Sequence, residues 1–257
     1  MSLFVDAHCH LDHPQFEKDM DAVIRRAKEA GVAAICTAGV HPASNRIALE
    51  LAKKYPIVKA CLGIYPPDAL QREMYDAQWK PFDVDEEIEY IRKHKEHVAM
   101  IGEVGLDYAD LASDKSAQRE IFEKMIQLAE KLRKPLVVHS RKAEQECVEM
   151  LQSARTKKII MHCFSGNFQL VKQIIDNGWF LTTPTHVVRA EHFQKIARDT
   201  PINQLLTETD APFLSPIKEQ RNEPAHVVVA VRKLAELKGM DIAEVERNIY
   251  MNFQQLI

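Results

Sequence analysis

The chain has 257 residues, of which 46% are hydrophobic and 28% are charged, and its formal net charge is -3. A chain of this length can bury a large core, and either one α/β barrel or two smaller domains would fit it. The mildly acidic net charge argues against nonspecific binding of nucleic acid by the surface as a whole, but it does not exclude a local basic groove.

The amino-terminal residues and the cysteines indicate the compartment. No basic segment followed by an apolar one opens the chain, and no apolar stretch approaches the ~20 residues that span a bilayer. The five cysteines are odd in number and form no CxxC pair, which is typical of free thiols in a reducing compartment. We therefore expect a cytoplasmic protein with no membrane partner.

Apolar, β-branched runs alternate with amphipathic stretches along the whole chain. The strand-like runs are residues 3–8, 32–39, 57–64, 98–107, 135–141, 158–165, 179–185 and 204–210. The helical stretches are residues 16–30, 43–55, 84–94, 116–133, 143–154, 168–178, 190–199 and 224–239, with a short helical tail after them. Such alternation predicts parallel β-α units, and eight units in a chain of this size predict a (β/α)8 TIM barrel.

A doubly wound open sheet is the structural alternative to the barrel. The first strand-like run is not followed by a GxGxxG segment, so a dinucleotide-binding version of that fold has no support. No Gly/Ser-rich or low-complexity linker divides the chain. We expect one TIM-barrel domain over residues 1–257 and no organic cofactor.

The first strand-like run ends in a polar segment, FVDAHCHLD, at residues 4–12. Because alternate residues of a strand point the same way, His8 and His10 share one face, and Asp6 lies on it too. Two histidines and a carboxylate on one face suggest the beginning of a metal site.

Polar side chains also follow the other strand-like runs, where TIM barrels carry their chemistry. A lone histidine at such a place is more often structural than a ligand, but a buried histidine or carboxylate is costly unless it is paired or coordinated. Nitrogen and oxygen donors without thiolate suit Zn²⁺, Mn²⁺ or Mg²⁺, so we predict a divalent-metal site. The strand-end residues are His8, His10, Glu103, Asp107, His139, Arg141, His162, Glu208 and Asp210.

Six segments, in order, resemble the signature segments of the TatD-type metal-dependent deoxyribonuclease family, which belongs to the amidohydrolase-like TIM barrels. They are DAHCHLD (6–12), GEVGLDY (102–108), VHSR (138–141), HCFSG (162–166), ETDAP (208–212) and RNEP (221–224). The resemblance covers nearly the whole chain. It implies a nuclease that acts on DNA with two divalent ions, often as a 3′–5′ exonuclease on single strands or 3′ ends.

The resemblance also implies roles for single residues. His8, His10 and Asp210 resemble the ligands of one metal ion, and His139 and His162 resemble the ligands of the second. Glu103 resembles the carboxylate that bridges the two ions, and Asp210 would also accept a proton from the attacking water. Glu208 should share a strand face with Asp210 and support it.

Four residues are candidate substrate contacts. Arg141, Arg221 and Asn222 would contact phosphate or the leaving group, unless they are ordinary surface or capping residues. The family commonly has a Gly-x-His-Pro segment after the third strand, whose histidine faces the substrate, whereas this chain has GIYPPDA (63–69). Tyr65 at that position can donate a hydrogen bond but carries no positive charge near neutral pH, and Asp68 adds negative charge nearby.

The same metal site could hydrolyse other bonds, because a fold does not fix a substrate. Some TatD-like proteins resemble D-aminoacyl-tRNA deacylases, so ester hydrolysis is the main alternative. Other amidohydrolase-type activities on phosphotriesters, lactones or cyclic amides form a third possibility. Those relatives often bridge their metals with a carboxylated lysine, so Glu103 in that place favours the nuclease-like group. A metal-binding scaffold without activity would predict a gap in the ligand set, and none is visible.

Overall fold

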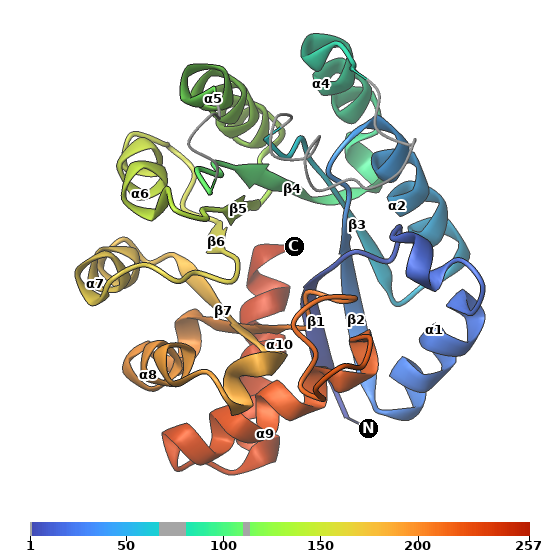
Figure 1. Cartoon of the computed structure of the whole chain (residues 1–257), viewed down its shortest axis with the longest axis vertical. Helices are drawn as coiled ribbons and strands as arrows, with labels where there is room; N and C mark the ends of the chain where they lie inside the picture. Colours follow the sequence, from blue (N-terminus) through green and yellow to red (C-terminus); the bar gives the residue numbers. More distant parts are fainter. Residues whose placement is uncertain (1, 67–80, 110–113) are drawn as a thin grey trace.

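The computed structural model of the protein describes residues 2–66, 81–109 and 114–257. Eight strands form one sheet in which each strand pairs in parallel with the next, in the order β1 to β8 (Figure 1). The strands are β1 Phe4–Cys9, β2 Val32–Ala38, β3 Val58–Leu62, β4 Val98–Gly105, β5 Leu136–His139, β6 Ile159–Met161, β7 Phe180–Pro184 and β8 Leu205–Glu208. The predicted (β/α)8 TIM barrel is therefore confirmed, and the open-sheet alternative is wrong.

Helices surround the strands on the outside of the ring (Figure 1). In the described residues they are α1 Met20–Glu29, α2 Pro42–Lys54, α4 Val84–Lys93, α5 Lys115–Leu132, α6 Glu144–Gln152, α7 Phe168–Asp176, α8 Glu191–Asp199, α9 Val227–Lys238 and α10 Ile242–Leu256. Short 3-10 helices lie at Pro14–Phe16, Lys95–His97, Thr185–Val188, Ile202–Gln204 and Pro224–His226. None of these described helices is both long and apolar enough to cross a membrane.

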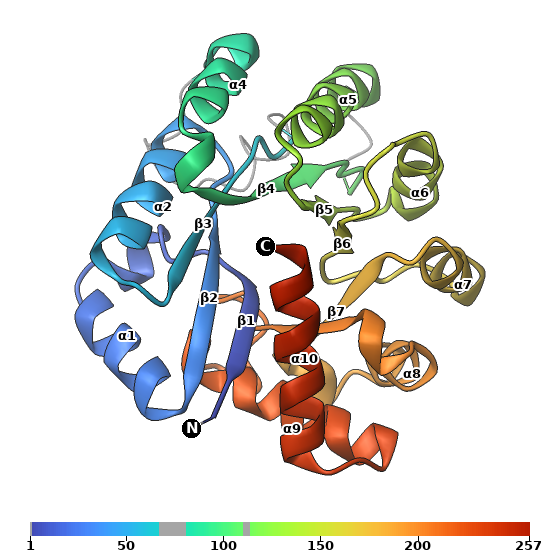
Figure 2. The ribbon, with the colours of Figure 1, turned by 180° about the vertical axis from the view of Figure 1, so that it is seen from behind.

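The carboxyl-terminal helix α10 is longer than the short tail that the sequence predicted. Asp241 caps it by accepting a hydrogen bond from the Ala243 backbone N–H, and Val245, Ile249 and Phe253 bury its apolar face. Asn252 donates to the carbonyl oxygen of Leu205, the first residue of β8. Figure 2 shows α10 across the back of the barrel, so it covers the end where the strands begin.

The barrel closes between its first and last strands. Thr207 donates its hydroxyl to the Val5 carbonyl oxygen over 2.7 Å, and the backbone N–H of Thr209 donates to Oδ1 of Asp6 over 2.8 Å. The Thr209 hydroxyl donates to the other oxygen of Asp6 over 2.6 Å. Asp6 therefore secures this seam through its hydrogen bonds with Thr209.

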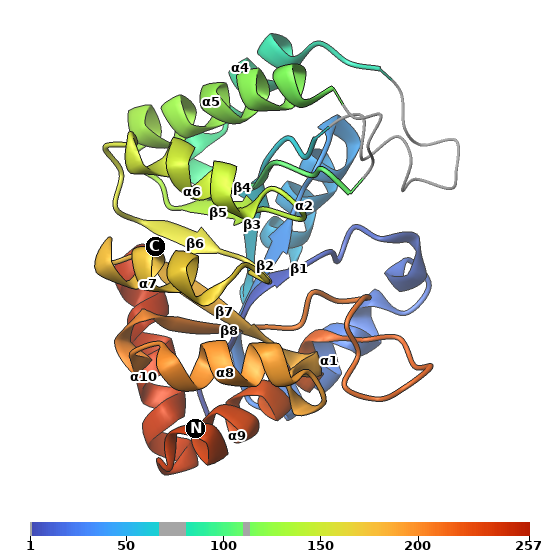
Figure 3. The same ribbon diagram turned by 60° about the vertical axis from the view of Figure 1, so that its left-hand side comes forward.

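The seam continues past the ends of both strands. The backbone N–H of Asp210 donates to the His8 carbonyl oxygen over 2.9 Å, and that of His10 donates to the Ala211 carbonyl oxygen over 2.7 Å. Figure 3 shows the loop after β8 beside the loop after β1, at the end toward which the strands point. These bonds bring the polar residues of the first and last strands together.

Candidate metal centre

The structure brings all six predicted metal ligands together at the carboxyl ends of the strands. They come from five places along the chain: His8 in β1 and His10 just after it, Glu103 in β4, His139 at the end of β5, His162 directly after β6, and Asp210 after β8. Hydrophobic strand residues beneath them, such as Val5, Ile101 and Val138, are fully buried and fix where each strand ends.

Glu103 lies at the middle of the cluster. One of its carboxylate oxygens faces His139 and His162, and the other faces His8 and His10. Its Oε1 lies 3.0 Å from Nδ1 of His139 and 3.4 Å from Nε2 of His162. Its Oε2 lies 3.5 Å from Nε2 of His8 and 3.4 Å from Nε2 of His10. Asp210 adds its Oδ1 at 3.5 Å from Nε2 of both His8 and His10.

The donor set fits divalent cations. His8, His10 and Asp210 form one group of possible ligands, and His8, Glu103 and His162 form another. Within each group the donor atoms lie within 4.8 Å of one another. Nitrogen and carboxylate oxygen donors at this density suit Zn²⁺, Mn²⁺ or Mg²⁺.

Protonation suits metal binding at His8 and Glu103. Burial alone would lower the pKa of His10, His139 and His162, but the neighbouring carboxylates outweigh it and raise those pKa values. Burial and the charge of His162 lower the pKa of His8, so His8 prefers the neutral form that ligates a metal. Burial alone would raise the pKa of Glu103, but His162 and His139 outweigh it and hold that pKa well below its ordinary value. A neutral imidazole and an ionised carboxylate therefore stand side by side.

A second layer of acceptors orients the histidines. His10 donates from Nδ1 to the Ala38 carbonyl oxygen over 3.2 Å, which directs its Nε2 into the cluster. His162 donates from Nδ1 to Glu208 over 3.2 Å, and Glu208 also accepts the backbone N–H of Cys163 over 3.1 Å. The prediction that Glu208 supports Asp210 is therefore wrong. Strand β8 ends at Glu208, and Asp210 has a φ of 55°, so the alternation does not extend to Asp210.

Two of the predicted substrate contacts converge on Asp107, just after β4. The Tyr65 hydroxyl donates to Oδ2 of Asp107 over 2.7 Å, and Arg141 donates from Nε to the same oxygen, also over 2.7 Å. Tyr65 is buried, whereas 47% of the Arg141 side chain is exposed. The rest of the segment after Pro66, including Asp68, lies outside the described residues.

The other two predicted substrate contacts are directed elsewhere. Both guanidinium Nη atoms of Arg221 donate to Asp19, over 2.9 and 2.7 Å. Asn222 is fully buried, and its amide donates to the carbonyl oxygens of Thr209 over 2.7 Å and Phe213 over 2.8 Å. Asn222 thus has no exposed surface to offer a substrate and instead holds the loop on both sides of Asp210. These roles of Arg221 and Asn222 could not be predicted from the sequence, because only the fold brings their hydrogen-bond partners close to them.

Asp107 was predicted only as one of the strand-end residues, without a role of its own, and the structure places it against a candidate ligand. Its Oδ2 lies 3.0 Å from Nε2 of His139. The signal was present, because Asp107 follows the apolar Leu106 at the same strand end as Glu103. Burial alone would raise the pKa of Asp107, but the hydrogen bonds from His139 and Tyr65 outweigh it and hold that pKa well below its ordinary value.

The backbone of Glu103 lies tightly against Gly63, the residue that follows β3. A Cβ added at Gly63 would come within 2.2 Å of the Glu103 carbonyl oxygen, so a side chain there must displace β4. Replacing Gly63 with alanine is expected to lower the free energy of unfolding by about 2 kcal/mol through overpacking, measured by urea denaturation. It should also weaken metal binding, because Glu103 moves.

Gly178→Ala is the control for this substitution. A Cβ at Gly178 meets nothing within 4 Å, although its φ of 73° disfavours alanine. We expect a cost of about 1 kcal/mol and unchanged metal binding. Equal effects of the two variants on metal binding would show that the contact between Gly63 and Glu103 does not position the carboxylate.

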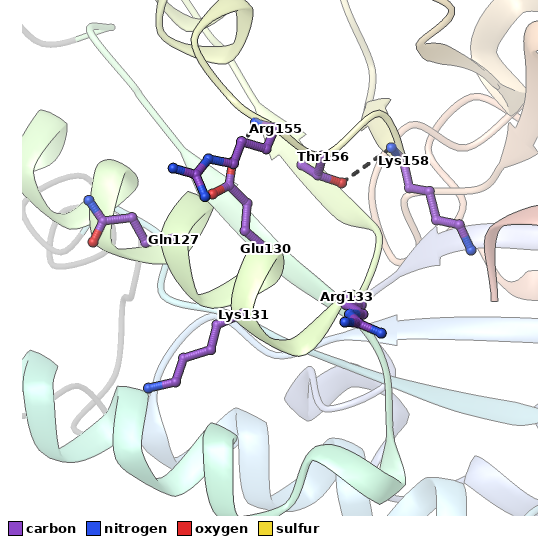
Figure 4. Close-up of a pocket in the computed structure, with 7 residues that line it drawn as sticks. All are labelled: Gln127, Glu130, Lys131, Arg133, Arg155, Thr156 and Lys158. Carbon is purple, nitrogen blue, oxygen red and sulfur yellow. Dashed lines mark hydrogen bonds between the residues drawn. The ribbon is translucent and has the colours of Figure 1, made fainter.

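A cavity of about 520 Å³ lies away from this cluster, between the end of α5 and the segment before β6 (Figure 4). Lys131 and Lys158 point away from each other in this view, and Lys158 donates to the Leu256 carbonyl oxygen over 2.8 Å. Because these two lysines are directed apart, we propose no binding or catalytic role for this cavity. A second hollow, of about 370 Å³, lies nearer the metal ligands, because Tyr108 and Lys142 in its wall directly follow Asp107 and Arg141.

Comparison with known proteins places this chain in a family. Residues 5–257 match the family model described as TatD related DNase. The chain is 33% identical to human deoxyribonuclease TATDN3 over 246 residues, which cover 94% of this chain and 89% of the human protein. It is 37% identical over 250 residues to an uncharacterised metal-dependent hydrolase of Methanocaldococcus jannaschii, covering 97% of this chain and 94% of that protein.

A solved structure agrees with these matches. The TatD homologue YjjV of Escherichia coli K12 superposes with a TM-score of 0.87 at 25% sequence identity, covering 99% of this chain and 97% of that chain. The family-model match over residues 5–257 spans the positions of all six residues of the candidate metal centre. The chain therefore belongs to the TatD related DNase family and is a metal-dependent hydrolase.

Proposed function

We propose that this protein is a deoxyribonuclease that cleaves DNA phosphodiester bonds with two bound divalent ions, Zn²⁺, Mn²⁺ or Mg²⁺. The observation that carries the proposal is the place of Glu103, whose two carboxylate oxygens each face a different pair of histidines. A carboxylate so placed is suited to bridge two ions. The proposed ligands are His8, His10 and Asp210 for one ion and His139 and His162 for the other, with Glu103 shared.

Two ions would lower the pKa of a water molecule and neutralise charge that develops on the phosphoryl oxygens. Asp210 is the proposed proton acceptor. Burial alone would raise the pKa of Asp210, but its hydrogen bond with His10 and the charge of His162 hold that pKa below its ordinary value. Asp210 is therefore ionised near neutral pH and can take a proton from the attacking water.

Arg141 is the proposed phosphate contact. Its Nε donates to Asp107, which anchors the side chain beside the cluster, and 47% of the side chain remains exposed to a ligand. A guanidinium can pair with two phosphate oxygens at once, and this stabilises the charge of the transition state. We propose that Arg221 and Asn222 support the loops around Asp210 instead of contacting the substrate.

The names of the relatives support DNA as the substrate, and the family resemblance supports the direction of cleavage. The human and mouse relatives are named as a deoxyribonuclease and a putative deoxyribonuclease. We propose that this chain removes nucleotides from 3′ ends of single strands.

The test uses a single-stranded DNA oligonucleotide labelled at its 5′ end, with Mg²⁺ or Mn²⁺. We expect a ladder that shortens from the 3′ end and that disappears with EDTA and in the Asp210→Ala variant. An intact oligonucleotide with both metals would contradict the nuclease proposal, and the ester bond of aminoacyl-tRNA would be the next substrate. Fragments from internal cuts would contradict the direction alone.

A further inference from the structure

The side chain of Asp107 is fixed by hydrogen bonds to both of its carboxylate oxygens. It is fully buried, and its Oδ2 accepts hydrogen bonds from Tyr65, His139 and Arg141 over 2.7, 3.0 and 2.7 Å. Its Oδ1 accepts the backbone N–H of Ala109 over 2.9 Å. A carboxylate that accepts this many bonds has one fixed orientation.

The backbone of Asp107 is fixed as well. Its N–H donates to Oε1 of Gln118 over 2.8 Å, and Nε2 of Gln118 donates back to its carbonyl oxygen over 2.9 Å. Gln118 is itself buried, in the first turns of α5. Gln118 of helix α5 therefore fixes the backbone of Asp107. The side chain of Asp107 in turn holds His139 and Tyr65 in place.

The bond to Asp107 decides which nitrogen of His139 faces the cluster. A carboxylate only accepts hydrogen bonds, so Nε2 of His139 carries the proton that it donates to Asp107. Nδ1 then lies 3.0 Å from Oε1 of Glu103, on the side of the other candidate ligands, so it is the nitrogen available to a metal ion. Without Asp107 the ring could rotate, and Nδ1 would no longer point at the cluster.

Tyr65 stands where the family pattern has a histidine that faces the substrate, yet only 5% of it is exposed. Its ring centroid lies 4.8 Å from that of His139, and its hydroxyl lies 3.1 Å from Nε2 of His139. Its backbone N–H donates to the Val40 carbonyl oxygen over 3.0 Å. Tyr65 is thus packed against Asp107 and His139, with little surface left for a substrate.

We propose that Asp107 is a positioning residue that fixes the ring orientation of His139, with Nδ1 toward the cluster, and that Tyr65 acts on the metal centre through Asp107 without touching the substrate. The proposal rests on the proposed function only in taking His139 as a metal ligand. It assigns His139 to the metal through Nδ1.

Metal titration of the intact protein tests the proposal without DNA. Calorimetry with Mn²⁺ should show that Asp107→Asn weakens binding of one ion by about 10- to 100-fold, as for other partners of ligating histidines. Tyr65→Phe removes one of several bonds to Asp107, so we expect binding of the same ion to weaken by about 2- to 10-fold. Unchanged affinity in Asp107→Asn would overturn the proposal, and unchanged affinity in Tyr65→Phe would overturn the role of Tyr65.

The chain offers a matched control pair. The Tyr55 hydroxyl donates to Asp21 at the outer side of the barrel, where α2 ends beside α1. Tyr55→Phe and Asp21→Asn remove the same kind of bond far from the cluster, and they should leave Mn²⁺ affinity unchanged. If these controls lost as much Mn²⁺ affinity as the test variants, the loss would come from lower stability of the whole protein, and the proposal would be wrong.

A spectroscopic readout separates positioning from packing and covers the case in which Asp107→Asn does not fold. Nitrogen-15 NMR of the wild-type protein loaded with Zn²⁺ should report His139 bound through Nδ1 with its proton on Nε2, and Tyr65→Phe should decrease the fraction of His139 bound in this way. A proton on Nδ1 in the Zn²⁺-loaded wild-type protein would overturn the proposal. So would a Tyr65→Phe variant with unchanged metal affinity and unchanged ligation of His139 but a higher KM for DNA, because Tyr65 would then be a substrate contact.

Failure of the proposed function gives a different pattern. If the protein binds metal as described but leaves DNA intact, the nuclease proposal fails and the assignment of Asp107 stands. If His139→Ala binds Mn²⁺ as tightly as the wild-type protein, His139 is not a ligand, and the assignment of Asp107 fails with it.

Discussion

Replacing Asp210 with alanine is expected to lower the rate of DNA hydrolysis by about 10³-fold or more while the barrel stays folded. The variant loses both a candidate ligand and the proposed proton acceptor, and general-base catalysis alone contributes about 10²- to 10⁴-fold. Asp210 lies beyond the end of β8, and its contacts are with His8 and His10 instead of the apolar core. The measurement is the initial rate on a labelled oligonucleotide, together with circular dichroism and metal content.

A second variant separates the chemistry of Asp210 from its backbone. Asp210 has a φ of 55°, which asparagine tolerates better than alanine does, so Asp210→Asn should fold as well as the wild-type protein. It should nevertheless lose activity to a similar extent, because an amide does not accept the proton. Asp176→Asn, on the exposed face of α7, is the control. Full activity in either Asp210 variant would remove this residue from the mechanism.

Replacing Glu103 with glutamine is expected to weaken metal binding at least about 100-fold and to abolish hydrolysis. The carboxylate lies within 3.5 Å of nitrogen atoms of four histidines, so it contacts both halves of the cluster. Glutamine keeps the shape but loses the negative charge that balances bound cations. Metal content of the purified protein and calorimetry with Mn²⁺ measure the effect.

The matched control for Glu103→Gln is Glu149→Gln, on the exposed side of α6, where the glutamate accepts a bond from Gln145. It should bind metal and cleave DNA as the wild-type protein does. If Glu103→Gln kept two ions with unchanged affinity, the shared-ligand role of Glu103 would be wrong.

The barrel could be predicted from the sequence because local patterns of apolar residues determine its strands and helices. Each strand-like run is apolar and each helical stretch is amphipathic, so element type can be predicted from periodicity, and eight repeats leave few topologies. The strand-end residues, which include the six candidate metal ligands, could be predicted for the same reason, and the family resemblance selected these six. Parallel strands bring their carboxyl ends to one edge, so polar residues at those ends must meet.

What the sequence could not predict depends on contacts between distant loops. Asn222 and Arg221 lie in a loop whose partners, Thr209 and Asp19, only the fold brings near. Glu208 faces His162 because β8 ends one residue before the backbone turns, and strand ends are the least predictable part of a strand. Tyr65 was assigned by analogy with a histidine, but its hydroxyl reaches Asp107 instead.

The seam between β1 and β8 has a consequence for folding. An ion held by His8, His10 and Asp210 would tie the beginning of the chain to a point near its end, and so act as a reversible cross-link across most of the polypeptide. Closing so long a loop costs the unfolded chain much conformational entropy, which a cross-link removes in advance. Metal binding would thus strengthen the junction that turns an eight-stranded sheet into a closed barrel. Catalytic competence and the completeness of the fold would then respond together to the supply of one ion.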